Sequence, residues 1–268
     1  AAERIKLVGS LMIDGVGARR GREEARSRIG IEQRERVITL FPGLRRREVS
    51  VTAPFLFRAA ELLARVEQDV SFILCLSPFV GTASLDRLFS HTTHAARIDG
   101  AAARVEKSAG PLEAITAEGI RIRIETVLMY EAMAASDIAV CTPGPVCAEL
   151  AYLGVPHVVT APLNVPGAVA VPGVSPLLCS LPFIGETFQR RAVDRLKTSS
   201  RFVSIANQRA GKMIAPEIVG RLRPEDVVIP CVELLGEAAR RDKMSKELRE
   251  AAGLTGAADR VVQAIQRA

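Results

Sequence analysis

The chain of 268 residues is 48% hydrophobic and 25% charged, which is enough apolar material for one large α/β domain or two small ones. Aromatic residues make up 4% and tryptophan does not occur, which disfavours a β-sandwich core and a nucleic-acid partner, because both depend on large flat rings. The net charge of +6 is concentrated in basic clusters at 17–28, 44–48 and 189–201, which suit phosphates, an anionic membrane surface or a solvated face.

Short apolar runs bounded by turn residues have the length and composition of β-strands. They cover residues 5–9, 36–41, 70–76, 120–125, 137–142, 156–161 and 201–205. Helical patterns lie between several of them, at 51–67, 127–136, 145–153 and 184–197. This alternation predicts a Rossmann-like, doubly wound and mainly parallel α/β sheet. The tail, 223–238 and 245–268, predicts two or three helices that pack outside the sheet or reach across to a neighbour.

Two regions interrupt the alternation. Residues 82–119 are the least regular and are interpreted as an insertion or an elaborated crossover. Residues 158–185 carry no charge, but five prolines would break an isolated helix, so we interpret about 160–185 as an apolar, Pro-rich loop and not as a membrane span. This loop would pack on its own domain or contact lipid or an acyl-bearing substrate. No internal repeat is evident, so residues 1–268 are expected to form a single domain.

The cysteines indicate a reducing compartment, because none of them forms a C-x-x-C pair and most lie in apolar runs. They are Cys75, Cys141, Cys147, Cys179 and Cys231. The first ten residues contain no signal-peptide apolar region and begin abruptly, as if another segment preceded them. We therefore expect a cytoplasmic protein.

In open parallel sheets, ligands bind beyond the carboxyl ends of the strands, where turns lead into helices with free N–H groups. One such turn follows the strand at 36–41. Gly43 would let the backbone approach a ligand, and Arg45 would present a two-pronged donor to a phosphate.

The second turn lies in "VCTPGPVCAELAYLGVP", residues 140–156. Gly144 would make the turn, and the amides of Val146 and Cys147 would face an anion at the start of a helix. Glu149, one turn further, would accept hydrogen bonds from hydroxyls such as those of a ribose, or would complement the helix dipole. We expect both turns to lie at one edge of the sheet.

Other polar motifs are weaker. His91 and His94 could share a helical face but lack an acidic partner, so no metal site is expected, and His157 is interpreted as structural. The sequence contains no G-x-G-x-x-G, G-x-x-x-x-G-K-[ST] or G-x-S-x-G pattern, which disfavours a dehydrogenase, a P-loop NTPase and an α/β-hydrolase.

Four blocks in a fixed order give the chain a recognisable pattern. They read "LVGSLMIDG" (7–15), "TLFPGLRRREV" (39–49), "YEAMAASDIAVCTPGPVCAELAYLGVPHVV" (130–159) and "RFVSIANQRAGKMIAPEIV" (201–219). This pattern resembles the C-terminal, nucleotide-sugar-binding half of a GT-B glycosyltransferase, specifically of the lipid A disaccharide synthase family. The last block is the most specific, because its N-x-x-A-G spacing has no generic structural reason.

The resemblance implies a function. By position, Arg45, Gly144, Glu149, Asn207 and Gly211 match residues of the family's motifs, and this half would hold the UDP moiety. The family transfers an acylated glucosamine from UDP to a lipid-linked sugar phosphate, inverting the anomeric centre without a metal ion or cofactor. The family's acceptor site and general base belong to an N-terminal acceptor domain, which we expect to be absent from this chain. Without that domain or a partner chain that replaces it, the chain is expected to bind nucleotide but to turn over the sugar donor poorly or not at all.

The chain also departs from the family's motifs. Leu44 replaces a serine of the first turn, and Pro143 and Pro145 flank Gly144 where the family has hydroxyl residues. Two alternatives therefore stay open: a non-catalytic binding or scaffold module derived from this fold, and another GT-B relative such as a UDP-N-acetylglucosamine epimerase or the peptidoglycan glucosaminyltransferase.

Overall fold

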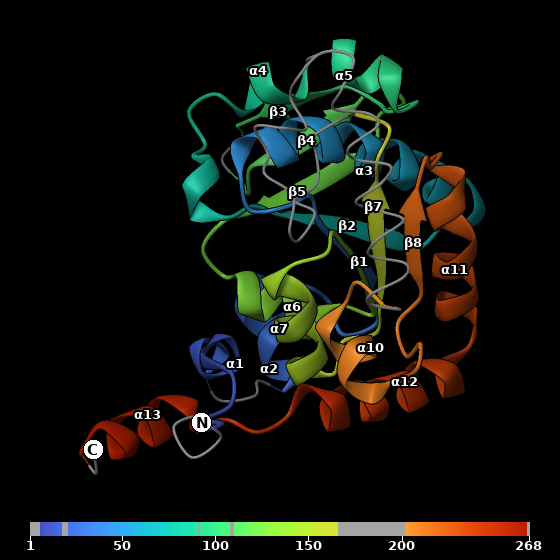
Figure 1. Cartoon of the computed structure of the whole chain (residues 1–268). Coiled ribbons are helices and arrows are strands. Elements are labelled where there is room, and N and C mark those ends of the chain that lie inside the picture. Colours follow the sequence, from blue (N-terminus) through green and yellow to red (C-terminus); the bar gives the residue numbers. More distant parts are fainter. Residues whose placement is uncertain (1–5, 18–20, 91, 108–109, 166–201, 267–268) are drawn as a thin grey trace.

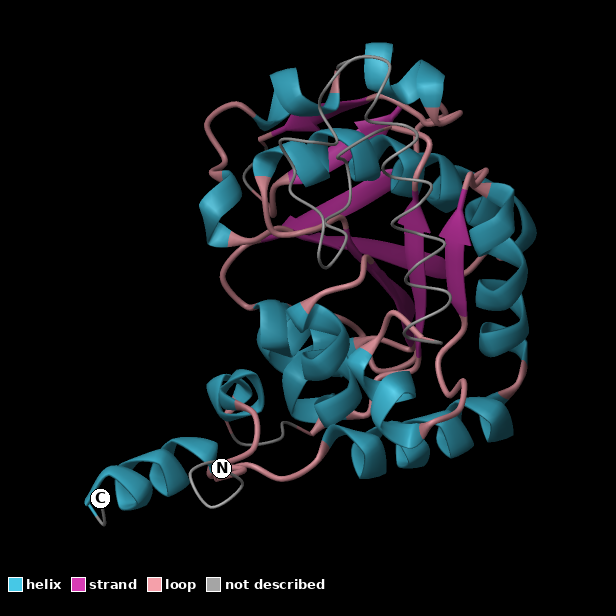
Figure 2. Cartoon of the chain, viewed as in Figure 1, coloured by secondary structure: helices cyan, strands magenta, loops and turns pink. Residues whose placement is uncertain are grey.

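The computed structural model describes residues 6–17, 21–90, 92–107, 110–165 and 202–266 (Figure 1). Its strands, magenta in Figure 2, form one sheet. The strand order is β3-β4-β5-β2-β1-β6-β7-β8. All neighbours from β5 to β8 pair in parallel, whereas β3–β4 and β4–β5 are antiparallel. The strands are β1 (Arg36–Phe41), β2 (Val70–Cys75), β3 (Ala103–Glu106), β4 (Glu113–Thr116), β5 (Arg121–Glu125), β6 (Ile138–Cys141), β7 (His157–Pro162) and β8 (Glu217–Gly220).

Helices cover both faces of the sheet, as expected for a doubly wound fold. They are α1 (Leu11–Val16), α2 (Arg22–Ile29), α3 (Arg46–Val66), α4 (Leu85–Phe89), α5 (Thr92–Arg97), α6 (Met129–Ala135), α7 (Pro145–Leu153), α10 (Ile205–Ala210), α11 (Glu225–Gly236), α12 (Ala238–Ala252) and α13 (Ala257–Gln266), with a 3₁₀ turn η2 (Pro78–Val80). Helix α3 packs with α11, α4 and α5, whereas α7 packs with α1, α10 and α12, and α2 packs with α6. The central strands are consequently buried on both sides, which explains their continuous apolar sequences.

The structure confirms the predicted fold class and most of the predicted elements. Strands were correctly predicted at 36–41, 70–76, 120–125, 137–142 and 156–161, as were helices α3, α6 and α7 and the helical tail, α11 to α13. Helix α3 begins five residues earlier than predicted, at Arg46. The predicted helix at 184–197, the loop from 166 onward and Cys179 lie outside the described residues.

Two predicted strands are wrong. Residues 6–10 form an extended segment outside the sheet, where Arg260 Nε donates to the Val8 carbonyl at 2.8 Å in place of a neighbouring strand. Residues 202–204 form a loop that leads into α10, and the Ser204 hydroxyl accepts a hydrogen bond from the Asn207 amide as an N-cap. In both segments a side chain forms a hydrogen bond with a backbone group. These short apolar runs are therefore held in place without pairing to a neighbouring strand.

Residues 82–119 are more regular than their sequence indicates. They form α4 and α5 and then the antiparallel strands β3 and β4, which extend the sheet beyond β5. The region therefore elaborates the crossover from β2 to β5. It lies at the far end of the strand order from β8 and adds no turn between β1 and β6.

Candidate functional site

The two predicted ligand-binding turns leave the same edge of the sheet side by side. Strands β1 and β6 are parallel neighbours, and their last residues, Phe41 and Cys141, are paired in register. The Thr142 amide, the first residue beyond β6, donates to the Phe41 carbonyl at 3.2 Å. The turn at 42–45 therefore lies next to the turn at 142–144, at the carboxyl ends of two central strands.

The first turn is stabilised by Glu48, which folds back over it from the first turn of α3. Glu48 Oε2 accepts hydrogen bonds from the amides of Leu44 at 3.0 Å and Arg45 at 3.2 Å. Gly43 has φ 116°, and a Cβ atom there would lie 2.8 Å from Glu48 Cβ, so only glycine fits without displacing this carboxylate. Two amides that a ligand could have used are therefore already bonded within the protein.

Positive charge remains available at the first turn. The Arg45 side chain is 72% exposed, and its closest carboxylate oxygen, Glu48 Oε1, lies 3.8 Å away. Arg46 and Arg47 are exposed beside it. These guanidinium groups stand at the N-terminus of a 21-residue helix, whose own Glu48 carboxylate already complements the helix dipole.

The second turn opens directly into α7. Gly144 is the N-cap residue, Pro145 occupies the first helical position, and a Cβ atom on Gly144 would meet nothing within 4 Å. The Cys147 amide, predicted to face an anion, donates instead to the Gly144 carbonyl at 3.1 Å. The Val146 amide, also predicted to face an anion, has no intrahelical acceptor, because it lies in the first turn of the helix.

Two thiols pack beneath the second turn. Cys141 Sγ lies 3.5 Å from Cys147 Sγ, and the Cys147 thiol donates to the Thr142 carbonyl at 3.5 Å. Both side chains are fully buried. The neighbouring Cys147 thiol and burial hold the pKa of the Cys141 thiol well above its ordinary value. Cys141 therefore supports the turn by packing and is unsuited to act as a nucleophile.

Glu149 is a half-buried carboxylate in the second turn of α7. Burial raises its pKa, and the Tyr130 hydroxyl, which donates to Glu149 Oε1 at 3.3 Å, acts in the opposite direction. Among the described residues no Lys or Arg forms an ion pair with Glu149. Its carboxylate can therefore accept hydrogen bonds from a ligand without breaking an ion pair.

A third helix start at this edge is closed by the protein itself, which the sequence did not reveal. Glu125 is the last residue of β5, and its Oε1 accepts hydrogen bonds from the amides of Thr126, Val127 and Leu128 at 3.0, 2.9 and 2.9 Å. Burial alone would raise the pKa of Glu125, but these N–H groups and Arg123 outweigh it and lower the pKa. The residues that lead into α6 are thus not an anion site.

Asn207 is a structural residue in this conformation. It is fully buried, and its amide donates to the Ala215 carbonyl at 2.7 Å and to Glu217 Oε1 at 2.8 Å. Its Oδ1 accepts the amides of Ile214 and Ala215. A direct bond from Asn207 to a ligand would therefore require one of these bonds to break.

Gly211 ends α10 in the left-handed conformation, with φ 65°, and allows the chain to reverse toward β8. The pairing of Val159 with both Cys141 and Glu217 places the start of β8 level with the end of β6. The fourth sequence block thus forms a turn, closed by its own hydrogen bonds, that positions β8 beside the candidate site. In the sequence, only the resemblance to the family's motif singles out this block.

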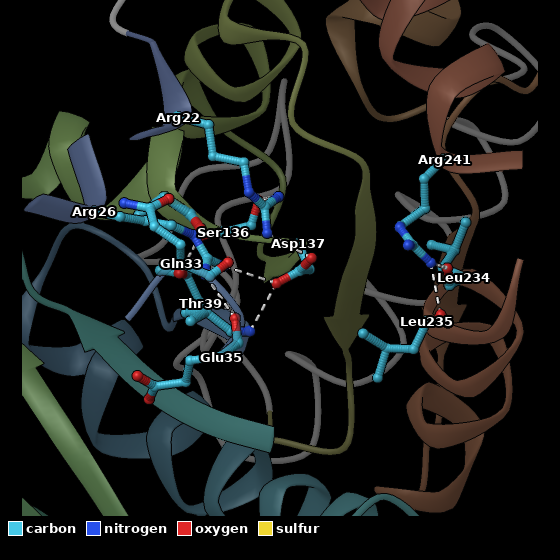
Figure 3. A network of polar contacts seen from close by, with 12 residues as sticks. Arg22, Arg26, Gln33, Glu35, Thr39, Ser136, Asp137, Leu234, Leu235 and Arg241 are labelled. Carbon is cyan, nitrogen blue, oxygen red and sulfur yellow. Dashed lines mark hydrogen bonds and ion pairs between the residues drawn. The ribbon is translucent and has the colours of Figure 1, made fainter. Parts of the chain in front are cut away.

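The "ASD" segment of the third block belongs to a polar network (Figure 3) that lies at the opposite ends of β1 and β6 from the two turns. Asp137 lies just before β6 and accepts hydrogen bonds from Arg22 at 2.6 Å, Arg26 at 3.0 Å and the Val37 amide at 2.8 Å. Arg26 is fully buried and also donates to the carbonyls of Glu32, Gln33, Glu35 and Ala135. Burial lowers its pKa, with a further contribution from Arg22. This part of the basic cluster at 17–28 therefore holds α2 in place and is not available to a phosphate or a membrane.

The remaining candidates are the histidines, of which His91 and the side chain of His94 lie outside the described residues. His157 is fully buried, its Nδ1 bonds the Val155 carbonyl at 2.8 Å, and burial lowers its pKa to about 4. Within the described ranges, no group of three or more His, Cys, Asp or Glu side chains could hold a metal ion. Over the same ranges, no helix is both long and apolar enough to cross a membrane.

Comparisons with known proteins show which proteins this chain resembles. The family model described as Lipid-A-disaccharide synthetase matches residues 2–102. The chain is 28% identical over 261 residues to the lipid-A-disaccharide synthase of Syntrophus aciditrophicus (strain SB), covering 96% of this chain and 55% of that protein. It is 27% identical over 266 residues to the same enzyme of Prochlorococcus marinus (strain MIT 9313), covering 98% and 57%. The chain thus spans little more than half the length of these relatives.

A solved structure supports the fold. The UDP-GlcNAc 2-epimerase from Neisseria meningitidis, solved bound to UDP-GlcNAc, superposes with a TM-score of 0.50 at 12% identity, covering all of this chain and 58% of that protein. At this identity the likeness concerns the fold alone. The resemblance expected from the four sequence blocks is therefore confirmed by the sequence relatives, and the α/β fold class by the structure.

Proposed function

From the likeness of this chain to lipid-A-disaccharide synthases over nearly its whole length, we propose that it is the UDP-sugar-binding half of a glycosyltransferase. The transferase moves an acylated glucosamine from UDP to a lipid-linked sugar phosphate, inverting the anomeric centre without a metal ion. The observation that carries the proposal is the contact of the two turns at one sheet edge, joined by the hydrogen bond from Thr142 to Phe41.

Each turn contributes a different group to the donor. The exposed Arg45 guanidinium bonds the diphosphate, with the Val146 amide on the other side, and Gly43 and Gly144 allow the backbone to come close. Glu149 accepts hydrogen bonds from the ribose hydroxyls. The buried Asn207 and the reversal at Gly211, which lie outside this set, position the neighbouring backbone and do not touch the donor.

The chemistry follows from where charge develops. As the bond between sugar and diphosphate breaks, UDP gains negative charge, and the guanidinium of Arg45 and the N-terminus of α7 stabilise it more in the transition state than in the bound donor. We assign the acceptor site and the general base to a second domain or partner chain, for which the greater length of the relatives leaves room. This chain alone binds the donor and does not turn it over.

We also place the enzyme at the cytoplasmic face of a membrane, as a peripheral protein. An acylated donor and acceptor reside in or near a lipid surface, and exposed arginines at 45–47 suit anionic headgroups. Co-sedimentation with vesicles containing phosphatidylglycerol tests this placement. Binding should fall steeply as salt is raised, and salt-independent or absent binding would contradict it.

Calorimetry with UDP tests the donor site. Arg45→Ala should weaken binding about tenfold or more, since it removes a charge-assisted hydrogen bond, and Glu149→Ala should also weaken it. Arg34→Ala is the matched control, because Arg34 is exposed at the opposite edge of the sheet, before β1. Equal, small effects of all three substitutions would contradict the assignment.

A scaffold module without nucleotide binding is the second candidate. It is favoured by the hydroxyls replaced at Leu44, Pro143 and Pro145, and by the occupation of two turn amides by Glu48. The same titration separates the two candidates. No heat of binding for the unmodified chain at millimolar UDP would favour the scaffold.

A further inference from the structure

Two large apolar side chains are exposed at the edge of the sheet that carries the candidate donor site. Phe79 is 90% exposed and Val127 is 83% exposed. Phe79 follows β2 and Val127 follows β5, and these strands continue the parallel order from β1 outward. Both residues therefore lie in turns just beyond the carboxyl ends of these strands. In the strand order these turns follow the turn at 42–45, which we call the first donor turn, in the direction away from β6.

The exposure of Phe79 is fixed by its turn. The Ser77 hydroxyl accepts the Phe79 amide at 3.3 Å and the Ser77 carbonyl accepts the Val80 amide at 2.9 Å. Val80 is 4% exposed and anchors the turn in the core, so Phe79 is held outward by the same geometry. Burying an exposed aromatic ring against a ligand would remove a large apolar area from water.

Val127 lies on an equally ordered turn. Its amide is bonded by the Glu125 carboxylate at 2.9 Å, and the Glu125 carbonyl accepts the Leu76 amide at 2.9 Å. This last bond ties the end of β5 to the end of β2. The two turns that expose Val127 and Phe79 are therefore joined through their backbones.

The apolar pair borders the basic turn. Arg46 donates to the Val80 carbonyl at 3.3 Å and to the Ser84 hydroxyl at 2.6 Å, which ties the turn carrying Phe79 to the start of α3. Arg45 and Arg47 are exposed on either side of Arg46 in sequence. A surface with guanidinium groups next to an aromatic ring and an aliphatic side chain complements a ligand that joins a phosphate to a hydrocarbon chain.

We propose that Phe79 and Val127 form a binding surface for an acyl chain of the sugar substrate whose diphosphate lies at the adjacent turns. The inference rests on the proposed function and adds to it the contact that distinguishes an acylated donor from a plain nucleotide. It predicts that UDP alone, which has no apolar tail, does not use this surface.

The test compares two ligands on matched variants by calorimetry. UDP and a UDP-2,3-diacylglucosamine with acyl chains short enough to stay monomeric are titrated into the unmodified chain, Phe79→Ser, Val127→Ser and Ile229→Ser. Ile229, on α11, is 64% exposed and serves as the control for removing an exposed apolar side chain elsewhere. Thermal unfolding of each variant verifies that it is folded.

The expected result is a selective loss. Phe79→Ser should weaken the acylated ligand about tenfold, Val127→Ser should weaken it less, and both should leave UDP within about twofold. Ile229→Ser should change neither ligand. If Phe79→Ser weakens both ligands equally, or neither, the inference is overturned while the donor site stands. If UDP does not bind the unmodified chain, the proposed function fails and the inference fails with it.

Discussion

Asp137→Ala tests whether the "ASD" segment, which contributes to the resemblance, acts in folding or in the site. Asp137 is the counter-charge of the fully buried Arg26 and accepts the amide of Val37 at 2.8 Å. Its removal leaves a buried guanidinium with carbonyl partners but no anion, and a buried N–H without an acceptor. Breaking a buried ion pair in this way costs about 3–5 kcal/mol. Because Asp137 is 12% exposed and Arg22 is 44% exposed, water compensates part of the loss, and we expect about 3 kcal/mol.

The assay is equilibrium unfolding in urea, followed by circular dichroism, with UDP titration of the folded variant. Arg240→Ala is the control, since Arg240 is 39% exposed and its partner Glu233 is 47% exposed, so its loss should cost no more than about 1 kcal/mol. UDP affinity of Asp137→Ala should stay unchanged, because the network lies at the opposite ends of β1 and β6 from the donor turns. A loss of stability below about 1 kcal/mol, or a weaker UDP complex in a folded variant, would refute this reasoning.

Three further predictions concern the site and the core. Glu149→Gln should raise the thermal midpoint at pH 7 yet weaken UDP binding. Burial raises the pKa of Glu149 in the folded chain, so its ionised carboxylate lowers stability at pH values above the pKa of the unfolded chain. A lower midpoint would contradict this. The pKa of His157 is lowered to about 4, so as the pH falls the unfolded chain is protonated at this residue before the folded chain is. The contribution of His157 to stability should be complete above about pH 6.5 and fall as the pH drops toward 4. In urea titrations at several pH values, His157→Gln should flatten this slope, whereas an unchanged slope would assign it to other groups. Gly43→Ala should lower stability by about 1–3 kcal/mol and weaken UDP binding, because the added Cβ atom would displace Glu48. Gly119 is the control: it has φ 82° and nothing near the position of a Cβ atom, so Gly119→Ala should lower stability less and leave binding unchanged. Equal losses of stability would rule out the Glu48 contact as the cause.

The sequence predicted the elements whose pattern reflects burial on both sides. Strands β1, β2, β6 and β7 have continuous apolar runs between turn residues, and α7 spans Pro145–Leu153, the range that its pattern predicts, with Gly154 as its C-cap residue. The order of strands and helices then placed the two donor turns at one edge, because parallel neighbours end together. This much follows from local pattern and topology.

The remaining features depend on long-range contacts that no local pattern encodes. Strand β8 has only four residues and is recognisable through its pairing with β7. Glu125 closes one helix start and Glu48 closes the first turn, and both closures depend on where the carboxylate folds. The position of Glu125 at a strand end and of Glu48 in a first helical turn does not reveal this in the sequence. Asn207 looked like a ligand-binding side chain because its motif is specific, whereas its amide is used within the fold.

The most direct test of the account is an NMR titration of the isotopically labelled chain with UDP. The backbone amides of Gly43 and Val146 and the side-chain Nε–H of Arg45 report on the two turns separately. If both turns bind one diphosphate, all three signals shift with a single dissociation constant, while the amide of Val37, at the opposite edge, stays in place. Shifts confined to one turn, or two different dissociation constants, would contradict a shared site.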